Sequence, residues 1–391
     1  MESLQRTFRV LLKMNSFLLI IIIGFVFTSC DLKSSQEVKT QTVNQDSIRK
    51  SDSLKRIDSL RQLSPSYEND SLEFDGLERV IRLTENINNP KSVAISPNGR
   101  HAYINNLEGM NTMIINTETF ETESIIEHTG KPVEFGFTNG GRYVWISYFR
   151  LLEKGYPANL GVERNYRYKS VVVIYDTLEQ KLVNRIDVGI IPKIIAVSPD
   201  DKLVFVANWN SYDISVISTQ SFEVIKTIKV GAIPRGVEFT PNGKYAYVCN
   251  FGGSTISKIE VESLEVISTI ENVGYKPRDM VIDNEGKYAY FSNFGDGNLR
   301  KLDLSSDEVV DKVKIGSEPR SVAMTNNCKY IFVVNYANGT VDAISTEDLK
   351  VIGEYKADIG AVGVALTPDN KYLWVTNQST GSIIVYKVNY K

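Results

Sequence analysis

The order of apolar and polar positions repeats along most of the chain. The stretches PRGVEFTPNGKYAYVCNF, PRDMVIDNEGKYAYFSNF and PRSVAMTNNCKYIFVVNY follow one another in a common frame. Seven units share this frame, and their successive starts lie 42, 60, 42, 43, 42 and 42 residues apart. The starts are Pro90, Pro132, Pro192, Pro234, Pro277, Pro319 and Ala361. Self-similarity at a period of this length is typical of repeat folds, so the units are numbered one to seven below.

Each unit predicts four short strands. In unit four these are the apolar stretch after Pro234, residues 245–250 after a tight Asn-Gly turn, residues 255–259 and residues 264–270. Four strands in about 42 residues match one blade of a β-propeller. We therefore predict an all-β, seven-bladed β-propeller with four antiparallel strands per blade. An aromatic residue thirteen positions after each start is predicted to pack between blades: Tyr103, Trp145, Phe205, Tyr247, Tyr290, Phe332 and Trp374.

The last unit ends at Lys391 after three strands. The missing fourth strand is predicted to come from residues 77–83, because LERVIRL resembles the fourth strand FEVIKTI and leads into the first unit in the same way. A seventh blade built from both ends of the chain closes the ring and removes the open sheet edges that would promote aggregation.

The second strands also carry a family resemblance. KYAYVCN, KYAYFSN and KYLWVTN resemble the YVTN repeat of seven-bladed propellers, a family of exported bacterial and archaeal proteins related in fold to surface-layer propellers, lactonases and quinoprotein dehydrogenase chains. The resemblance covers residues 76–391 and implies the fold. It does not select a function, because enzymes and binding modules share this fold.

The first residues have the pattern of an export signal. Arg6, Arg9 and Lys13 precede an apolar run over residues 17–27, which small residues and Cys30 follow. The run is too short to cross a membrane as a helix. We interpret residues 1–29 as a signal peptide. The ending resembles the bacterial lipoprotein signal, which implies that Cys30 is acylated and anchors the chain to a membrane.

Residues 30–75 differ in composition from the repeats. They are rich in Ser, Asp, Lys, Arg and Gln and nearly free of aromatic residues, so they cannot build a core and are predicted to form a flexible tether. The predicted domains are therefore the signal, this tether and the propeller over residues 76–391. The expected location is the bacterial cell envelope, at the outer membrane, and the expected state is a monomer.

Charge and composition exclude several classes of function. The net charge is −3, which argues against a general nucleic-acid binder. The chain has only two histidines, His101 and His128, and neither lies in a catalytic or metal-binding motif, so we expect no metal and no cofactor. Cys249 and Cys328 fall in different blades and are predicted not to form a disulfide.

Two repeated positions predict a binding site on one face of the ring. The residue after the start is basic in five units: Lys91, Lys193, Arg235, Arg278 and Arg320. Seventeen residues after the start, five units carry an aromatic residue: Phe149, Trp209, Phe251, Phe294 and Tyr336. Both positions map to the face where the first strands begin. Aromatic rings alternating with cations suit anionic or sugar-like ligands. The first strands carry few inward acidic residues.

An asparagine precedes this aromatic position in six units, and Tyr148 replaces it in unit two. The asparagines are expected to hydrogen-bond the turn that follows them. The extra residues of unit two, from Arg150 to Ser170, lie on the same face as the predicted site. We expect Arg164, Tyr166 and Tyr168 to contribute to it, because long loops on rigid scaffolds are often functional.

These observations predict a lipid-anchored propeller that binds an anionic or sugar-like ligand, or a protein partner, without catalysis of its own. One alternative is an enzyme, a lactonase-like hydrolase or a quinoprotein-type oxidoreductase, with a metal or cofactor in the central channel. Another is a platform that docks proteins of the cell envelope.

Overall fold

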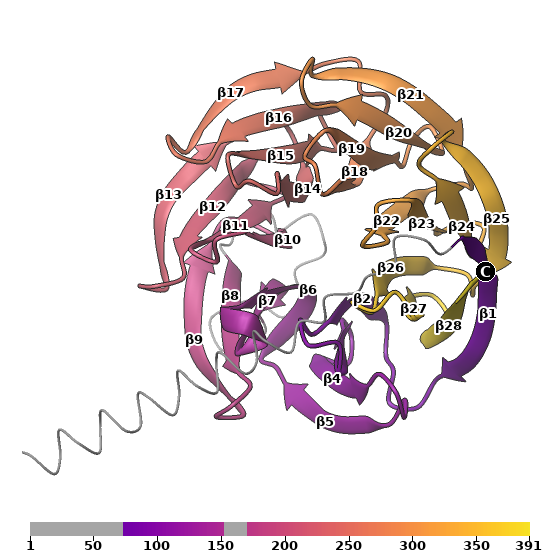
Figure 1. The fold of residues 1–391 in the computed structure, drawn as a ribbon. Helices are drawn as coiled ribbons and strands as arrows, with labels where there is room; N and C mark the ends of the chain where they lie inside the picture. The colour runs from indigo at the N-terminus through magenta and orange to yellow at the C-terminus, as the bar shows by residue number, and fades with distance from the viewer. Residues whose placement is uncertain (1–72, 152–169) are drawn as a thin grey trace, which may run out of the picture. The chain divides into compact units, whose positions relative to one another are not determined.

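The computed structural model describes residues 73–151 and 170–391, which form seven four-stranded antiparallel sheets arranged in a ring (Figure 1). In this part of the chain the one helical element is a short 3₁₀ turn, η1 (Asn139–Gly141), and no helix is long and apolar enough to cross a membrane. The prediction of an all-β, seven-bladed propeller is confirmed. The signal peptide, Cys30 and nearly all of the predicted tether lie outside the described residues.

The first four blades follow the repeat units. Blade one consists of β2 (Pro90–Ile95), β3 (His101–Asn106), β4 (Asn111–Asn116) and β5 (Thr122–Glu127). Blade two consists of β6 (Gly130–Thr138), β7 (Tyr143–Leu151), β8 (Ser170–Asp176) and β9 (Lys181–Val188). Blade three consists of β10 (Pro192–Val197), β11 (Leu203–Asn208), β12 (Asp213–Ser218) and β13 (Glu223–Lys229). Blade four consists of β14 (Pro234–Phe239), β15 (Tyr245–Asn250), β16 (Thr255–Glu260) and β17 (Glu265–Ile270).

The last three blades complete the ring. Blade five consists of β18 (Pro277–Ile282), β19 (Tyr288–Asn293), β20 (Asn298–Asp303) and β21 (Glu308–Lys314). Blade six consists of β22 (Pro319–Met324), β23 (Tyr330–Asn335), β24 (Thr340–Ser345) and β25 (Lys350–Lys356). Blade seven consists of β26 (Ala361–Leu366), β27 (Tyr372–Asn377), β28 (Ser382–Tyr390) and the N-terminal strand β1 (Phe74–Leu83).

The predicted closure of the ring is confirmed, because β1 pairs antiparallel with β28. The strand begins at Phe74, three residues before the predicted boundary. The reason is that the Phe74 ring packs against Tyr330, Phe332 and Tyr355 of blade six, and its backbone N–H donates to the Tyr330 hydroxyl at 3.0 Å. These contacts tie the first described strand to two blades.

The second strands form the core between blades, as their apolar sequences predict. The seven aromatic residues thirteen positions after the starts are buried. Phe205 of blade three, for example, packs against Phe239 of blade four with ring centroids 4.7 Å apart. The inter-blade role predicted for this position is confirmed.

Tight turns join the first and second strands of each blade. The residue before the basic turn residue has a positive φ in every blade, including Gly243 at 68° and Cys328 at 56°. Glycine adopts this conformation at little cost, and Cys328 replaces it in blade six. Cys328 and Cys249 are both free thiols, which confirms that they form no disulfide.

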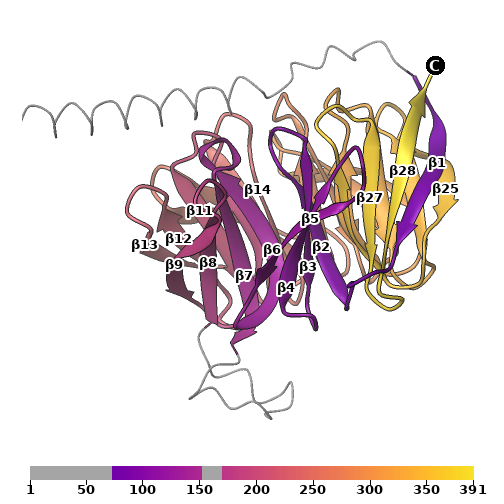
Figure 2. The same ribbon diagram turned by 90° about the horizontal axis from the view of Figure 1, so that it is seen from below.

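The innermost strands position the candidate site. These strands, β2, β6, β10, β14, β18, β22 and β26, lie side by side around the centre of the ring (Figure 1). They begin on one face, here called the loop face, and end at the tight turns on the other, here called the hairpin face; Figure 2 shows the strands running between the two faces. Equivalent residues of the repeats are therefore brought around a single axis.

Deleting residues 74–83 is expected to lower the Tm by about 10 °C or more, because the partly buried side chains of β1 each contribute about 1–3 kcal/mol of hydrophobic stabilisation. Circular dichroism melting curves of the full chain and the deletion variant measure the change. Deletion of ten residues from the predicted tether, 40–49, serves as the control. Equal melting temperatures for both deletions would contradict the closure.

Candidate functional site

Five cations gather at the loop-face end of the innermost strands. They are the residues predicted from the repeat: Lys91 on β2, Lys193 on β10, Arg235 on β14, Arg278 on β18 and Arg320 on β22. Protein encloses them, and Lys193 and Arg278 are each only 8% exposed. The structure therefore places the basic residues in the interior of the ring and not on a solvated rim.

The five cations interact electrostatically across the ring. Burial, reinforced by Arg278 and Arg320 from blades five and six, lowers the pKa of Lys91 in blade one well below its usual value. Burial and the neighbouring Arg235 lower the pKa of Lys193 in the same way, and burial with Arg320 lowers the pKa of Arg235 to about 10. Cationic side chains from different blades thus lie close enough to repel one another.

None of the five cations forms a side-chain hydrogen bond or ion pair with any residue that the structure describes. The Nε atoms of Arg235 and Arg320 are fully buried without a hydrogen-bond partner, as is the indole Nε1 of Trp209. Buried polar groups in proteins are nearly always hydrogen-bonded, and a buried charge without a partner is costly. These donors form an unusual cluster of unsatisfied groups.

The predicted aromatic residues alternate with the cations around the ring. Lys193 Nζ lies 4.3 Å from the ring centroid of Phe149 and 5.0 Å from that of Trp209. Arg235 Cζ lies 5.0 Å from the centroids of both Trp209 and Phe251.

The alternation continues through blades five and six. Arg278 and Arg320 each lie 5.7 Å from Phe294, and Arg320 lies 3.6 Å from Tyr336. The structure therefore brings the predicted cations and rings into one arc, and cation–π attraction orders the side chains within it.

The seven first strands carry three acidic residues, which agrees with the prediction of few. Glu134 on β6 and Asp279 on β18 lie among the cations, and Glu238 on β14 lies near Asp279. Burial raises the pKa values of Glu134, Glu238 and Asp279 to about 7, 8 and 6. The Asp279 carboxylate accepts a hydrogen bond from the Val322 N–H at 3.1 Å. The carboxyl groups of Glu134 and Glu238 have no hydrogen bond to described residues.

Repeat analysis missed these acids because they do not repeat. Glu134 and Asp279 stand two positions after the start of their blades, where blades one and six have serine, and Glu238 stands four positions after the start, where the other blades have small or apolar residues. All three acids stand out when the seven units are aligned and the positions that depart from the repeat are compared.

The asparagines that end the second strands are structural, although their partners differ from the prediction. All six are buried. Asn250 Nδ2 donates to Thr255 Oγ1 at 3.0 Å and to Ser257 Oγ at 2.9 Å, both on the third strand of its blade. The amides therefore join the second and third strands more than they cap the intervening turn.

Blade two departs from this arrangement through a buried polar network. Tyr148 replaces the asparagine and its hydroxyl lies 2.9 Å from His128 Nδ1, while His128 Nε2 lies 2.8 Å from Thr112 Oγ1. Thr112 Oγ1 donates to Asn105 Oδ1 at 2.6 Å, and Asn105 Nδ2 donates to Ser92 Oγ at 3.3 Å. The Thr112 hydroxyl proton is thereby committed, so His128 donates from Nε2 and accepts from Tyr148 at Nδ1.

This network stands where other blades have apolar packing. The position of Thr112, second in the third strand, is aliphatic in every other blade: Val171, Ile214, Ile256, Leu299, Val341 and Ile383. Both nitrogens of His128 are engaged and the side chain is buried, which lowers its pKa to about 4. The network connects Tyr148 of blade two to Ser92 of blade one, the residue after Lys91. The sequence shows the polar replacements but not that they contact one another.

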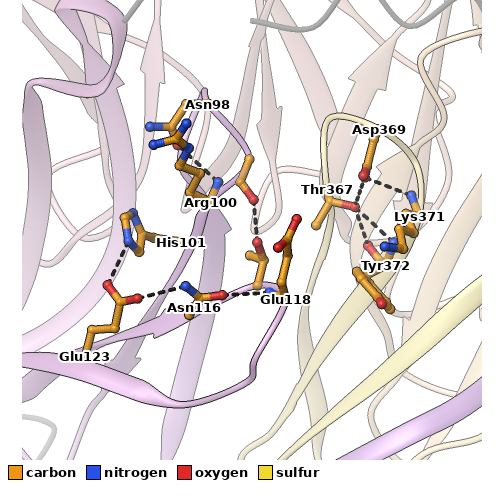
Figure 3. A pocket seen from close by; sticks show the side chains of 12 residues that line it. Asn98, Arg100, His101, Asn116, Glu118, Glu123, Thr367, Asp369, Lys371 and Tyr372 are labelled. Carbon is orange, nitrogen blue, oxygen red and sulfur yellow. Dashed lines mark hydrogen bonds and ion pairs between the residues drawn. The ribbon is translucent and has the colours of Figure 1, made fainter. Parts of the chain in front are cut away.

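A concave region lies on the hairpin face between blades one and seven (Figure 3). It is a groove of about 560 Å³. His101 Nε2 lies 2.9 Å from Glu123 Oε2, and Asn116 Nδ2 donates to Glu123 Oε1 at 2.8 Å. Asp369 accepts the backbone N–H of Lys371 at 3.0 Å. Many polar groups of the groove thus bond one another, unlike the cations of the central ring.

The remaining predicted site residues are not placed. Arg164, Tyr166 and Tyr168 lie outside the described residues, as does Cys30. Among residues 73–151 and 170–391, no cluster of three or more His, Cys, Asp or Glu side chains could hold a metal ion.

Comparison with known proteins gives a partial family match and a structural neighbour. The model of the Cytochrome D1 heme domain matches residues 278–367, which cover blades five and six and the first strand of blade seven. The solved structure of Kuenenia stuttgartiensis hydrazine synthase is similar, with a TM-score of 0.67, 18% identity, and coverage of 81% of this chain and 100% of that chain. At this identity the similarity supports the fold alone. No curated protein matches.

The pKa of His128 predicts a pH dependence of stability. Because the folded state holds the histidine neutral until about pH 4, while the unfolded chain takes up a proton near pH 6.5, stability falls as the pH falls through this window. The contribution lost between pH 7 and pH 4.5 is about 2 kcal/mol. In His128→Val, which introduces the residue that blade three has at this position, Val230, we expect that loss to disappear from the urea unfolding free energy.

The matched control is Thr112→Val, which keeps the imidazole and is expected to keep the pH-dependent loss. If His128→Val lost as much stability as the unaltered protein between the two pH values, the buried neutral histidine would be contradicted.

Proposed function

We propose that the protein is a binding module that holds an anionic ligand among the five cations of the central ring and performs no catalysis itself. The single observation that carries this proposal is the set of five enclosed cations, none of which forms a side-chain hydrogen bond or ion pair with a described residue. Transfer of a charge from water into protein costs several kcal/mol unless a partner compensates it. An anion bound among Lys193, Arg235, Arg278 and Arg320 would supply that partner.

The arrangement of the side chains supports an anion over other ligands. Guanidinium groups bind carboxylate and phosphate groups through paired hydrogen bonds, and three of the five cations are arginines. The aromatic residues beside them remain partly exposed and offer apolar surface for the body of the ligand. Charged and apolar contacts within one arc suit a small organic anion.

The proposed cellular setting comes from the N-terminal sequence. Acylation of Cys30 would anchor the chain at the outer membrane of the cell envelope, and residues 31–75 would hold the propeller away from the lipid surface. In this setting the protein would bind its ligand outside the cytoplasm as a monomer.

A haem-carrying enzyme is the second candidate, because the partial match to the Cytochrome D1 heme domain includes Arg278 and Arg320. The arginines would suit the carboxylate groups of a haem. The histidines do not suit its iron, because both ring nitrogens of His128 are hydrogen-bonded and His101 lies at the hairpin face, paired with Glu123. The described residues thus offer no histidine ligand at the ring of cations, and we favour the binding module.

The ligand proposal predicts stabilisation by anions. Phosphate, sulfate or citrate near 100 times its Kd is expected to stabilise the protein by about 2.7 kcal/mol and to raise the Tm by about 5 °C. Arg278→Gln is expected to weaken the binding of that anion about tenfold without lowering the Tm of the free protein, because it removes a buried charge that Arg235 and Arg320 repel.

Differential scanning fluorimetry at constant ionic strength measures both effects. Lys244→Gln, on the hairpin face, is the matched control and should respond to anions like the unaltered protein. An equal anion response in Arg278→Gln and Lys244→Gln would contradict the proposed site.

An absorption spectrum distinguishes the haem-carrying enzyme from the binding module. The purified protein, mixed with one equivalent of haemin, is expected to show the spectrum of free haemin, because no histidine is available to the iron at the central ring. A shifted Soret band of one bound haem per chain, or a haem that copurifies at that ratio, would favour the enzyme over the binding module.

A further inference from the structure

The carboxyl groups among the cations point to a more specific ligand. A site for a simple anion gains nothing from acidic side chains, because each ionised carboxylate repels the ligand. Yet Glu134 interacts electrostatically with Lys91, Lys193 and Arg278. Glu238 lies near Asp279, which in turn interacts with Arg278 and Arg235. The ring therefore presents hydrogen-bond acceptors as well as cations.

Glu134 and Glu238 are free to bind a ligand, whereas Asp279 is not. The Asp279 carboxylate accepts the Val322 N–H at 3.1 Å and so braces β18 against β22. Glu134 stands in blade two, where Val133 replaces the basic residue of the repeat. Neither glutamate carboxyl has a hydrogen bond or ion pair within the described part of the chain, although both are enclosed by protein.

Three kinds of group thus surround one axis. Guanidinium groups recognise a carboxylate or another acidic group. Carboxyl groups accept or donate hydrogen bonds and suit hydroxyl groups. The partly exposed rings of Trp209, Phe251 and Tyr336 suit the C–H faces of a saturated ring. A molecule that combines an acidic group, several hydroxyl groups and a compact ring would satisfy all three.

We propose that the ligand is an acidic sugar of the uronic acid class, with its carboxylate among Arg235, Arg278 and Arg320 and its hydroxyl groups toward Glu134 and Glu238. This inference rests on the proposed function and narrows it. A free uronate and a uronate at the end of a sugar chain share this chemistry.

Isothermal titration calorimetry with defined probes tests the inference. Galacturonate and glucuronate represent the proposed class, galactose lacks the acid, and phosphate and succinate lack the hydroxylated ring. At least one uronate is expected to bind about tenfold more tightly than succinate or phosphate, and galactose is expected not to bind detectably. The affinities for galacturonate and for its trimer are then compared. Tighter binding of the trimer would indicate that the ligand is the end of a sugar chain, and tighter binding of the monomer would indicate a free sugar.

Substitution of the glutamates gives the sharper test. Glu134→Ala is expected to weaken uronate binding about tenfold, because a hydrogen bond to a charged group is lost. At pH 8, where Glu134 with its pKa of about 7 is ionised, the same change is expected to strengthen phosphate binding about threefold, because a repelling charge is removed. Glu238→Ala provides a second, independent variant, and the exposed Glu265→Ala on β17 is the matched control that should change neither affinity.

The outcomes separate the two proposals. If phosphate or succinate binds as tightly as both uronates, or if the glutamate variants weaken all anions alike, the acidic-sugar inference fails and the anion site stands. If none of the acidic probes binds, both proposals fail. Opposite effects of Glu134→Ala on uronate and on phosphate would support the inference.

Discussion

Closure of the ring is the constraint on which the rest of this structure depends. The β1–β28 pairing completes the seventh blade and ties the two ends of the propeller together. Once the ring is closed, the seven innermost strands must lie around one axis, and equivalent positions of the repeats face one another. The basic residues that follow the start of five units are therefore brought together at one end of the innermost strands.

The electrostatics of the centre follow from that convergence. Five cations are held together at the loop-face end of the innermost strands, where burial lowers their pKa values and repulsion by neighbouring cations lowers those of all but Arg320 further. The aromatic rings between them offset part of the cost by cation–π attraction, which contributes about 0.5–2 kcal/mol for each contact. The part of the burial cost that remains makes a bound anion the best explanation of the cluster. The neighbouring carboxyl groups narrow the chemical class of that anion.

Features that repeat could be predicted from the sequence, and features that do not repeat could not. The 42-residue period predicts the blades, the buried aromatic residues, the closure and the placement of Lys193, Arg235, Arg278 and Arg320 on one face. Glu134 and Glu238 occur once each at their positions, so the period carries no information about them. His128 and Tyr148 are 20 residues apart, and only the pairing of strands shows that they share a hydrogen bond. Arg164, Tyr166 and Tyr168 remain predictions.

The central claim is that the cations of the ring hold an anion. A crystal structure of the full chain grown with selenate, with anomalous data at the selenium edge, tests it most directly. We expect an anomalous peak on the axis within hydrogen-bond distance of Arg235, Arg278 or Arg320. Absence of any anomalous peak there, with these guanidinium groups paired to carboxylates of the protein itself, would contradict the account.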